Sequence, residues 1–411
     1  MAVSPNDKIR IGCIGVGGMG VGNMNAFMKQ PDVEIVAVCD VDSKNLSRAA
    51  SAVMKAQHHM PSMHQDFRKV LDMKDVDAVM IATPDHWHAL PFIMACEAGK
   101  DIFCEKPISH DIYEGQMMVG AAKYHKRVVQ INTWQRSRAR FRDAMDFIRS
   151  GGAGTVRICR AWISSIRGLG QNPIKDPPPN LDWDFWCGPG PKVPYHDSIH
   201  PRWWRLYYDF GTGLAGDWGV HMIDIILQAM GDMHPREVSS VGGKIMSGED
   251  DDRTTPDTQM AVFKFKDFVM NWELHAVGEG LDEGPSNHGS EFIGDKGKLI
   301  VDRAKGITWK PYGDHPGPEA KNTEHDHIRD FLDNMRSRGK CASDIESMYY
   351  TTTCCHLMNV SYQIGRSITW DGEKGVIVGD KKAMEANAFR REYRKPWKLP
   401  YYKELVCWGG S

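Results

Sequence analysis

The chain has 411 residues, 41% hydrophobic and 25% charged, and its formal net charge is 51 − 53 = −2. These values are typical of a globular protein of two domains, and they exclude a disordered chain, a fibre and a strongly basic nucleic-acid-binding protein. No apolar stretch is long enough to span a bilayer. We therefore expect a soluble protein with neither a nucleic-acid nor a membrane partner.

The first residues and the cysteines bear on the compartment. The opening sequence MAVSPND has neither the basic nor the apolar region of a signal peptide. The ten cysteines include no C-x-x-C pair, which favours buried free thiols over a disulfide framework or a zinc site. We expect a cytoplasmic protein, and an exported protein whose leader precedes this sequence is the alternative.

Short apolar runs alternate with helix-length segments from residue 8 to about residue 150. The runs are IRIGCIGV, VEIVAVCDV, VDAVMIATP, DIFCEKP and RVVQINT. Nearly continuous apolar strands separated by helices indicate a parallel sheet that is covered on both faces. Residues 1–150 are therefore predicted to form a doubly wound Rossmann domain.

The pattern changes after residue 151, where strands follow one another mostly without helices. The runs are VRICRAWIS, VSSVGGKIM, TQMAVFKFK, FVMNWELHA, SEFIGDKG and KLIVDR. This pattern predicts an open, mostly antiparallel sheet. A Pro/Gly-rich loop at 172–194 interrupts the sheet, and a long helix is expected at 343–366. Residues 151–411 are predicted to form an α+β domain for substrate binding and oligomerisation, whose tail could pack back on the first domain.

A glycine-rich turn follows the first predicted strand. Gly15 allows the tight turn, Gly17 lets the backbone approach a pyrophosphate, and Gly20 permits close packing of helix on strand. Asp40 ends the second strand, where a carboxylate can accept both ribose hydroxyls and would repel a 2′-phosphate. The sequence therefore predicts NAD rather than NADP as the cofactor. The expected contacts in this part are Gly15, Gly17, Gly18, Met19, Gly20 and Asp40.

Two further motifs stand where the fourth and fifth strands should end. They are IATPDHWH at 81–88 and CEKPIS at 104–109. With them the chain resembles the Gfo/Idh/MocA oxidoreductase family, which includes glucose–fructose oxidoreductase and inositol dehydrogenase. The resemblance covers nearly the whole chain, including GSEFIGDKGKLIVDR and HLMNVSYQIGR in the second half.

The resemblance implies a catalytic set of three residues. The lysine of the Glu-Lys-Pro motif is Lys106, which in such proteins contacts the nicotinamide and the reacting oxygen, and the Lys-Pro bond there is usually cis. Asp217 and His221 in GDWGVHMID match the family's Asp-x-x-x-His. Their spacing, with that of Asp224, predicts one shared helix face. His221 is the expected general base, and Asp217 would orient it or bind a neighbouring hydroxyl.

The histidines invite a competing interpretation as metal ligands. His86 and His88 form an H-x-H pair, but we expect Asp85 to cap a helix and the rings to shape the nicotinamide side of the site. We expect no metal. The remaining cofactor contacts implied by the resemblance are Thr83, Pro84, Trp87, His88, Glu105, Lys106 and Trp134.

Tryptophan is concentrated in the expected substrate region, and six of the thirteen lie between positions 162 and 218. An indole presents a large apolar face and one N–H donor, which suits a sugar ring, although at least half should be core residues. INTWQRS departs from the commoner family pattern of an asparagine followed by arginine. The predicted substrate contacts are Arg136, Arg202, Trp204, Asp217 and His221.

These features predict an NAD-dependent oxidoreductase that oxidises a secondary hydroxyl of a sugar or glycoside, or reduces the corresponding ketone. One alternative is an NAD-dependent glycosidase that oxidises its substrate transiently and eliminates the aglycone. A second is a sensor that binds NAD without turnover. Family analogy also suggests a homodimer or homotetramer assembled through the open sheet.

Overall fold

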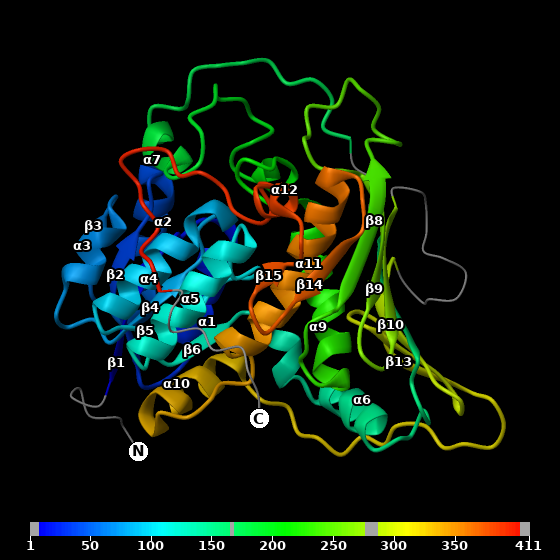
Figure 1. The fold of residues 1–411 in the computed structure, drawn as a ribbon. Coiled ribbons are helices and arrows are strands. Elements are labelled where there is room, and N and C mark those ends of the chain that lie inside the picture. The colour runs from blue at the N-terminus through cyan, green and yellow to red at the C-terminus, as the bar shows by residue number, and fades with distance from the viewer. Residues whose placement is uncertain (1–7, 165–167, 276–286, 403–411) are drawn as a thin grey trace.

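The computed structural model describes residues 8–164, 168–275 and 287–402. Two sheets lie on opposite sides of the molecule with helices between them (Figure 1). The fold class predicted from the sequence is confirmed: a parallel six-stranded Rossmann sheet is followed by a mixed, mostly antiparallel sheet of nine strands.

The Rossmann sheet has the strand order β3-β2-β1-β4-β5-β6, and all of its pairs are parallel. Its central strands are buried along almost their whole length, which explains their continuous apolar runs. The strands are β1 (Ile9–Ile14), β2 (Val33–Cys39), β3 (Ser62–His64), β4 (Ala78–Ile81), β5 (Asp101–Cys104) and β6 (Val129–Ile131).

Helices cover both faces of this sheet. Asp42, Asp66 and Asp111 cap three of them by accepting hydrogen bonds from backbone N–H groups of the first turn. The elements are α1 (Gly18–Met28), α2 (Ser43–Gln57), α3 (Phe67–Asp72), η2 (Asp85–Trp87), α4 (Ala89–Glu97), α5 (Ile112–Tyr124), η3 (Trp134–Ser137) and α6 (Ala139–Arg149).

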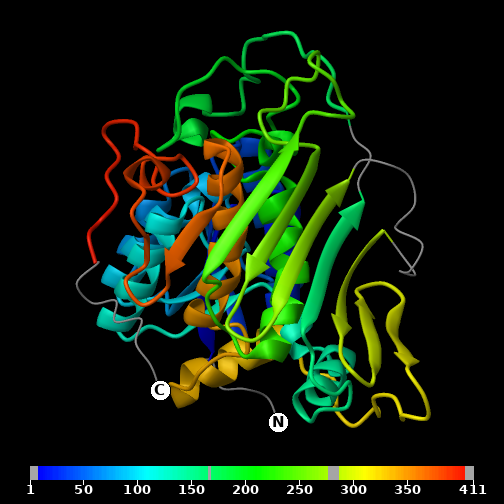
Figure 2. The ribbon, with the colours of Figure 1, turned by 45° about the vertical axis from the view of Figure 1, so that its right-hand side comes forward.

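The second sheet has the order β13-β12-β11-β7-β10-β9-β8-β14-β15, in which only β7 and β10 pair in parallel. Figure 2 shows it as a broad layer with helices behind it. The strands are β7 (Ile158–Ser164), β8 (Glu237–Gly243), β9 (Thr258–Lys264), β10 (Val269–His275), β11 (His288–Ile293), β12 (Gly297–Asp302), β13 (Gly306–Pro311), β14 (Ile368–Asp371) and β15 (Val376–Ile377).

Buried and exposed residues alternate along β8 and β9, so one face of this sheet packs on helices and the other is open. The open face carries the exposed apolar side chains of Val241, Met260 and Val262. The helical elements of this half are α7 (Trp183–Cys187), η4 (Trp203–Leu206), α8 (Gly213–Asp217), α9 (Gly219–Met230), α10 (His327–Ser337), α11 (Ile345–Ile364) and α12 (Lys381–Met384).

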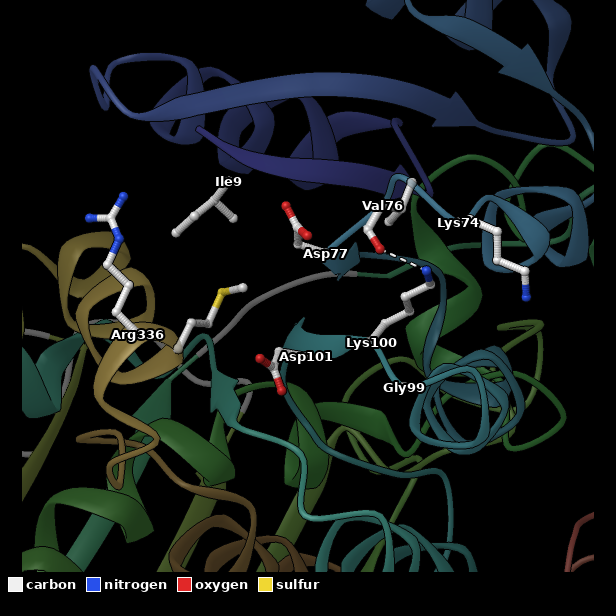
Figure 3. A pocket seen from close by; sticks show the side chains of 9 residues that line it. Ile9, Lys74, Val76, Asp77, Gly99, Lys100, Asp101 and Arg336 are labelled. Carbon is white, nitrogen blue, oxygen red and sulfur yellow. Dashed lines mark hydrogen bonds between the residues drawn. The ribbon is translucent and has the colours of Figure 1, made fainter. Parts of the chain in front are cut away.

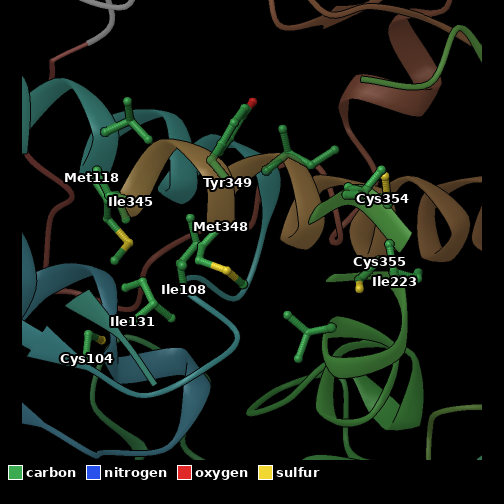
Figure 4. Packing of buried hydrophobic residues seen from close by; sticks show 14 of the residues in the cluster. Cys104, Ile108, Met118, Ile131, Ile223, Ile345, Met348, Tyr349, Cys354 and Cys355 are labelled. Atoms are coloured by element: carbon green, nitrogen blue, oxygen red, sulfur yellow. The ribbon is translucent and has the colours of Figure 1, made fainter. Parts of the chain in front are cut away.

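One hydrophobic core joins the two halves. Helix α11, which the sequence predicted at 343–366, contacts α5 of the first half and α9 and β8 of the second. Figure 4 shows Met348 of this helix beside Ile108, and Cys355 beside Ile223. The helix is buried on nearly all sides, and both apolar and small polar side chains of it are enclosed.

Later segments also return to the first half. Helix α10 packs Ile328 and Phe331 against the core under α1 and α2. In the tail, the Nε of Arg391 donates to Glu114 at 2.7 Å, and the hydroxyl of Tyr402 donates to Glu97 at 2.8 Å. None of the helices in the described ranges is long and apolar enough to cross a membrane.

Candidate active site

A cavity of about 930 Å³ opens at the carboxyl ends of β1, β2, β4 and β5 and extends into the second half of the chain. Ligands of doubly wound folds bind at this edge of the sheet. Most residues predicted for the site line it; Gly20, His88 and Arg136 do not. The predicted residues on its wall are Gly15, Gly17, Gly18, Met19, Asp40, Thr83, Pro84, Trp87, Glu105, Lys106, Trp134, Arg202, Trp204, Asp217 and His221.

The glycine turn has the geometry of a phosphate cradle. Gly15 has φ +81°, and a Cβ on it would lie 2.7 Å from the carbonyl carbon of Ala82. A Cβ on Gly20 would lie 1.9 Å from the oxygen of Gly15, so Gly20 serves helix packing rather than the cavity wall. Gly18 faces open space at the start of α1, where unpaired backbone N–H groups favour an anion. The turn therefore fits a pyrophosphate.

Asp40 occupies the expected position at the end of β2. Its carboxylate accepts hydrogen bonds from the backbone N–H groups of Val16 and Asp42, both at 2.9 Å. Burial raises the pKa of Asp40 to about 6, although these two hydrogen bonds oppose the shift. The side chain of Asn45 also hydrogen-bonds this carboxylate, which leaves a lone pair free for a ribose hydroxyl. Arg48, which the sequence analysis did not single out, also lines this end of the cavity.

Lys106 lies in the middle of the cavity wall and forms an ion pair with Asp217. Its Nζ donates to the Oδ1 of Asp217 at 2.6 Å and to the backbone oxygen of the same residue at 2.7 Å. The Nε of Arg205 donates to the same Oδ1 at 3.3 Å. Burial alone would raise the pKa of Asp217, but the two cations outweigh it and lower the value to about 2. The Lys106–Pro107 bond is cis.

His221 is held by Gln135, a residue that the sequence analysis overlooked. The Nε2 of Gln135 donates to the backbone oxygen of His221 at 2.5 Å, so its Oε1 faces the Nδ1 of the ring at 3.1 Å. Nδ1 must then carry the proton, which leaves the lone pair on Nε2. Burial, together with the charges of Lys106 and Arg303, lowers the pKa of His221 well below its usual value. His221 is therefore a neutral base at physiological pH.

The prediction that Asp217, His221 and Asp224 share one helix face is wrong. Asp217 ends α8, and α9 begins after an irregular Trp218, so the helical spacing is interrupted between them. Asp224 is fully buried and binds the Nε and Nη2 of Arg136 at 2.8 and 2.6 Å. Asp224 therefore does not contribute to the cavity.

Arg136 is not at the cavity, contrary to its predicted contact with substrate. Its guanidinium is 4% exposed and pairs with Asp224 and with Asp232, the latter at 2.7 Å. These contacts tie η3 to α9 and to the turn after α9. An arginine that follows a strand end can bind substrate or form a structural ion pair, and the local sequence does not distinguish these two roles. The acidic partners of Arg136 are distant in the chain, so the sequence did not reveal the ion pair.

In the PDHWH motif, the contacts of Asp85, His86 and His88 all differ from those expected from the sequence. Asp85 does not cap a helix through its side chain; it lines the cavity instead. Burial raises the pKa of its carboxyl to about 8, against the opposing charges of Arg205 and Lys106. The His86 ring contacts the oxygen of Trp186, and His88 contacts the oxygens of Thr83 and Pro107. The two histidines are thus bound to separate carbonyl groups.

Tryptophans divide between the cavity and the core. Trp203 and Trp204 line the cavity beneath the guanidinium groups of Arg202 and Arg205, at 5.0 and 4.2 Å respectively. Trp183 is instead a buried residue stacked on Trp186 at 4.6 Å, and Trp162 is buried as well. The indoles that line the cavity are Trp87, Trp134, Trp186, Trp203, Trp204 and Trp218.

Further polar residues of the cavity were not identified from the sequence. Asn132, in the INTW motif, donates to the Oε1 of Glu105 at 2.7 Å, and Asn23 donates to the same oxygen at 2.7 Å. Glu105 is therefore a positioning residue that links the cofactor side of the cavity to β6. Asn287 and Arg303 come from the second sheet, and no short motif marks either residue.

A smaller hollow of about 490 Å³ lies at the opposite, amino end of the parallel strands (Figure 3). Lys100 extends across it and donates to the backbone oxygens of Met73 and Val76, both at 2.7 Å. Its cation thus closes a gap between backbone segments. Among the described residues, no group of three or more histidine, cysteine, aspartate or glutamate side chains is placed to hold a metal ion.

Comparison with known families agrees with this geometry. Residues 9–133 match the Gfo/Idh/MocA oxidoreductase family in its NAD-binding Rossmann fold, and residues 155–399 match the family's C-terminal alpha/beta domain. Together the matches cover most of the chain. The protein belongs to the Gfo/Idh/MocA oxidoreductase family, and its first domain binds NAD.

Individual relatives are more distant. A glycosyl hydrolase family 109 protein from Saccharopolyspora erythraea is 32% identical over 175 residues, which cover 41% of this chain and 38% of the relative. The WlbA dehydrogenase from Bordetella pertussis, solved with NADH and UDP-GlcNAcA, has a TM-score of 0.68 at 17% identity, covering 89% of this chain and 99% of that one. Levoglucosan dehydrogenase, solved with NADH and levoglucosan, has a TM-score of 0.65 at 20% identity over 91% of this chain and all of that one.

Proposed function

We propose that this protein is an NAD-dependent dehydrogenase that oxidises a secondary hydroxyl of a sugar or glycoside, or reduces the keto-sugar. The observation that carries the proposal is the placement of Lys106, Asp217 and His221 on one wall of the cavity that begins at the glycine turn. The solved relatives that bind a nucleotide sugar and an anhydrosugar support the substrate class.

The three side chains divide the proton chemistry. NAD, when bound, supplies the hydride acceptor. Two of the three N–H groups of Lys106 are bound to Asp217, so the third can donate to the substrate oxygen and stabilise negative charge there as the C–H bond breaks. The free Nε2 of His221 takes the hydroxyl proton. Asp217 holds the Nζ of Lys106 in place at the cavity wall.

The cofactor assignment can be tested at Asp40. Replacing Asp40 by Ala removes the ribose contacts and the repulsion of a 2′-phosphate. We expect NAD affinity to fall by roughly tenfold and the preference for NAD over NADP to shrink. Calorimetric titration with both cofactors measures this. If the variant binds NAD and NADP as the parent does, Asp40 has no part in cofactor selection.

A second candidate function is an NAD-dependent glycosidase, which the family 109 relatives favour. After oxidation to a ketone, the C–H on the adjacent carbon becomes acidic, and a second base could remove its proton and expel the aglycone. Asp217 is too strongly stabilised as an anion for this role, and Asp224 is sealed by Arg136. Asp85, with a pKa raised by burial to about 8, is the better candidate base.

Incubation with glycosides in deuterated water, followed by NMR, separates the two functions. The dehydrogenase gives a keto-glycoside and an equal amount of NADH. The glycosidase gives free sugar with deuterium beside the oxidised carbon and no net NADH. We expect the first result; the second would replace the dehydrogenase by the glycosidase, and no change in any glycoside would contradict both.

We also propose that the protein forms a homodimer or homotetramer through the open face of the second sheet. Its exposed Val241, Met260 and Val262 form an apolar surface. Sedimentation of the parent and of a Val262→Lys variant would test this: the variant should dissociate at concentrations where the parent is assembled.

A further inference from the structure

Arg303 is a cation on the cavity wall that the proposed chemistry does not use. It follows β12 in the turn toward β13, and its guanidinium lies 4.9 Å from the ring of Trp134 and 5.4 Å from that of Trp218. Both indoles also line the cavity. Its charge acts on His221 and on Asp217, which places it at the substrate end rather than at the phosphate cradle.

The described residues supply Arg303 with no ion-pair partner, and its Nε is buried without a hydrogen bond. The charge of Asp217 acts on Arg303, but the carboxylate of Asp217 is already paired with Lys106 and Arg205. Burial lowers the pKa of Arg303 to about 10, so the side chain is still charged at neutral pH. The substrate end of the cavity therefore carries an uncompensated positive charge.

A half-buried guanidinium without an anion is unfavourable, and the two indole faces compensate for only part of the lost hydration. A guanidinium presents its N–H groups as a planar fork that matches the two oxygens of a carboxylate. A carboxylate on the substrate would accept hydrogen bonds from the outer N–H groups of the guanidinium and neutralise its charge. Neutral sugar hydroxyls could accept a hydrogen bond there but would leave the charge in place.

We propose that the substrate is a sugar acid whose carboxylate pairs with Arg303 between Trp134 and Trp218, while a ring hydroxyl lies at Lys106 and His221. The proposal rests on the function proposed above and narrows its substrate class. It makes Arg303 a specificity-determining residue: it selects the acid over the neutral sugar of the same ring configuration.

The test compares methyl glucuronide with methyl glucoside, and the matching galacto pair, which differ only in the carboxylate. Binding of each compound to the protein–NADH complex is measured by calorimetry, and kcat/KM is measured with NAD. Arg303→Met keeps an apolar side chain between the indoles but removes the charge. Arg138→Met is the matched control, because Arg138 lies 5.4 Å from the same Trp134 ring but is exposed and does not line the cavity.

We expect the parent to bind an acid at least about tenfold more tightly than its neutral partner, and Arg303→Met to abolish that ratio. Arg138→Met should change the ratio by less than about threefold. A parent without preference for either acid, or an Arg303→Met variant that keeps the preference, would overturn the inference. Binding of the acid that depends on Arg303 but yields no NADH would uphold the anion site and contradict the proposed dehydrogenase.

Discussion

Asp217 and Asp224 are close in sequence and both pair with a cation, yet their surroundings differ. The side chains of Asp217 and Lys106 are 19% and 14% exposed and face the cavity. Those of Asp224 and Arg136 are 0% and 4% exposed and face only protein. An ion pair can therefore be reactive or structural. A reactive pair is recognised by side chains that face the cavity and by a hydrogen-bond donor that remains free for the substrate.

The energetics of the two pairs differ for the same reason. Lys106 keeps a donor free for substrate, whereas the guanidinium of Arg136 makes four hydrogen bonds to Asp224 and Asp232. Losing one member of a fully buried pair leaves an uncompensated charge in a medium of low dielectric constant, which is strongly destabilising. Lys106 and Asp217, the cavity pair, lie at the cavity wall, so the loss of one leaves the other in contact with water. The main expected effect is then a lower rate of catalysis rather than a lower stability.

The largest expected effect comes from removing the cation of the cavity pair. Lys106→Met should retain NAD, because the glycine turn and Asp40 are untouched, but kcat/KM should fall by ~10²–10⁴. Steady-state kinetics with calorimetric NAD titration measures both. Lys74→Met, in the hollow at the far end of the sheet, is the control. Parental kinetics in Lys106→Met would remove this residue from the mechanism.

The next effect concerns the base beside the cavity pair. His221→Asn should lower kcat/KM by about 10² at neutral pH, and the loss should shrink at high pH, where hydroxide can replace the imidazole. Because the pKa of His221 is held well below its usual value, the parent should show no loss of rate as the pH falls through about 6.5. A pH profile of kcat for both proteins at saturating NAD, where ionisation of Asp40 does not limit the rate, checks this. A parental inflection near that pH would show that the base is not a neutral, buried His221.

The smallest expected effect is on stability, and it concerns Asp85, a third buried carboxyl that can be compared with Asp217 and Asp224. An unfolded aspartate ionises near about pH 4, whereas Asp85 keeps its proton up to about pH 8, so the folded state binds the extra proton between these values. The parent therefore loses stability as the pH rises through that window. The Asp85→Asn variant should not lose this stability, because the asparagine side chain does not ionise.

We expect the melting temperature of Asp85→Asn to exceed that of the parent by roughly 2–6 °C at about pH 8 and by much less at about pH 5. Thermal unfolding at the two pH values measures the difference. An advantage that grows toward low pH would mean that Asp85 is ionised in the folded protein, stabilised by the neighbouring Lys106 and Arg205.

Local motifs allowed the cofactor end of the site to be predicted from the sequence. A tight turn, a close backbone approach and a strand-end acid each need a particular residue at a fixed spacing, so Gly15, Gly17 and Asp40 could be identified directly. Continuous apolar runs likewise predicted the parallel sheet, and a long uninterrupted helical segment predicted α11. Short edge strands such as β3 and β15 carry too few residues to show a period.

The substrate end could be predicted only in part, because its residues come together through tertiary structure. The break at Trp218 separates Asp217 from α9, which carries both His221 and Asp224, and no helical spacing rule reveals such a break. Gln135 holds His221 without lining the cavity, and Arg303 reaches the cavity from a segment distant in the chain, so no local pattern marks the role of either residue. The parallel pairing of β7 with β10 is also set by topology rather than by local pattern.

The most direct test of the difference between the two pairs is a side-by-side measurement of Asp217→Asn and Asp224→Asn, recording melting temperature and turnover per folded molecule. Asp217→Asn should lose about 10² in turnover and change the melting temperature by less than roughly 2 °C. Asp224→Asn should lose about 2–4 kcal/mol of stability, with turnover per folded molecule within about threefold of the parent. If Asp217→Asn instead unfolds more readily and Asp224→Asn loses turnover while keeping its stability, the assignment of a reactive and a structural pair is contradicted.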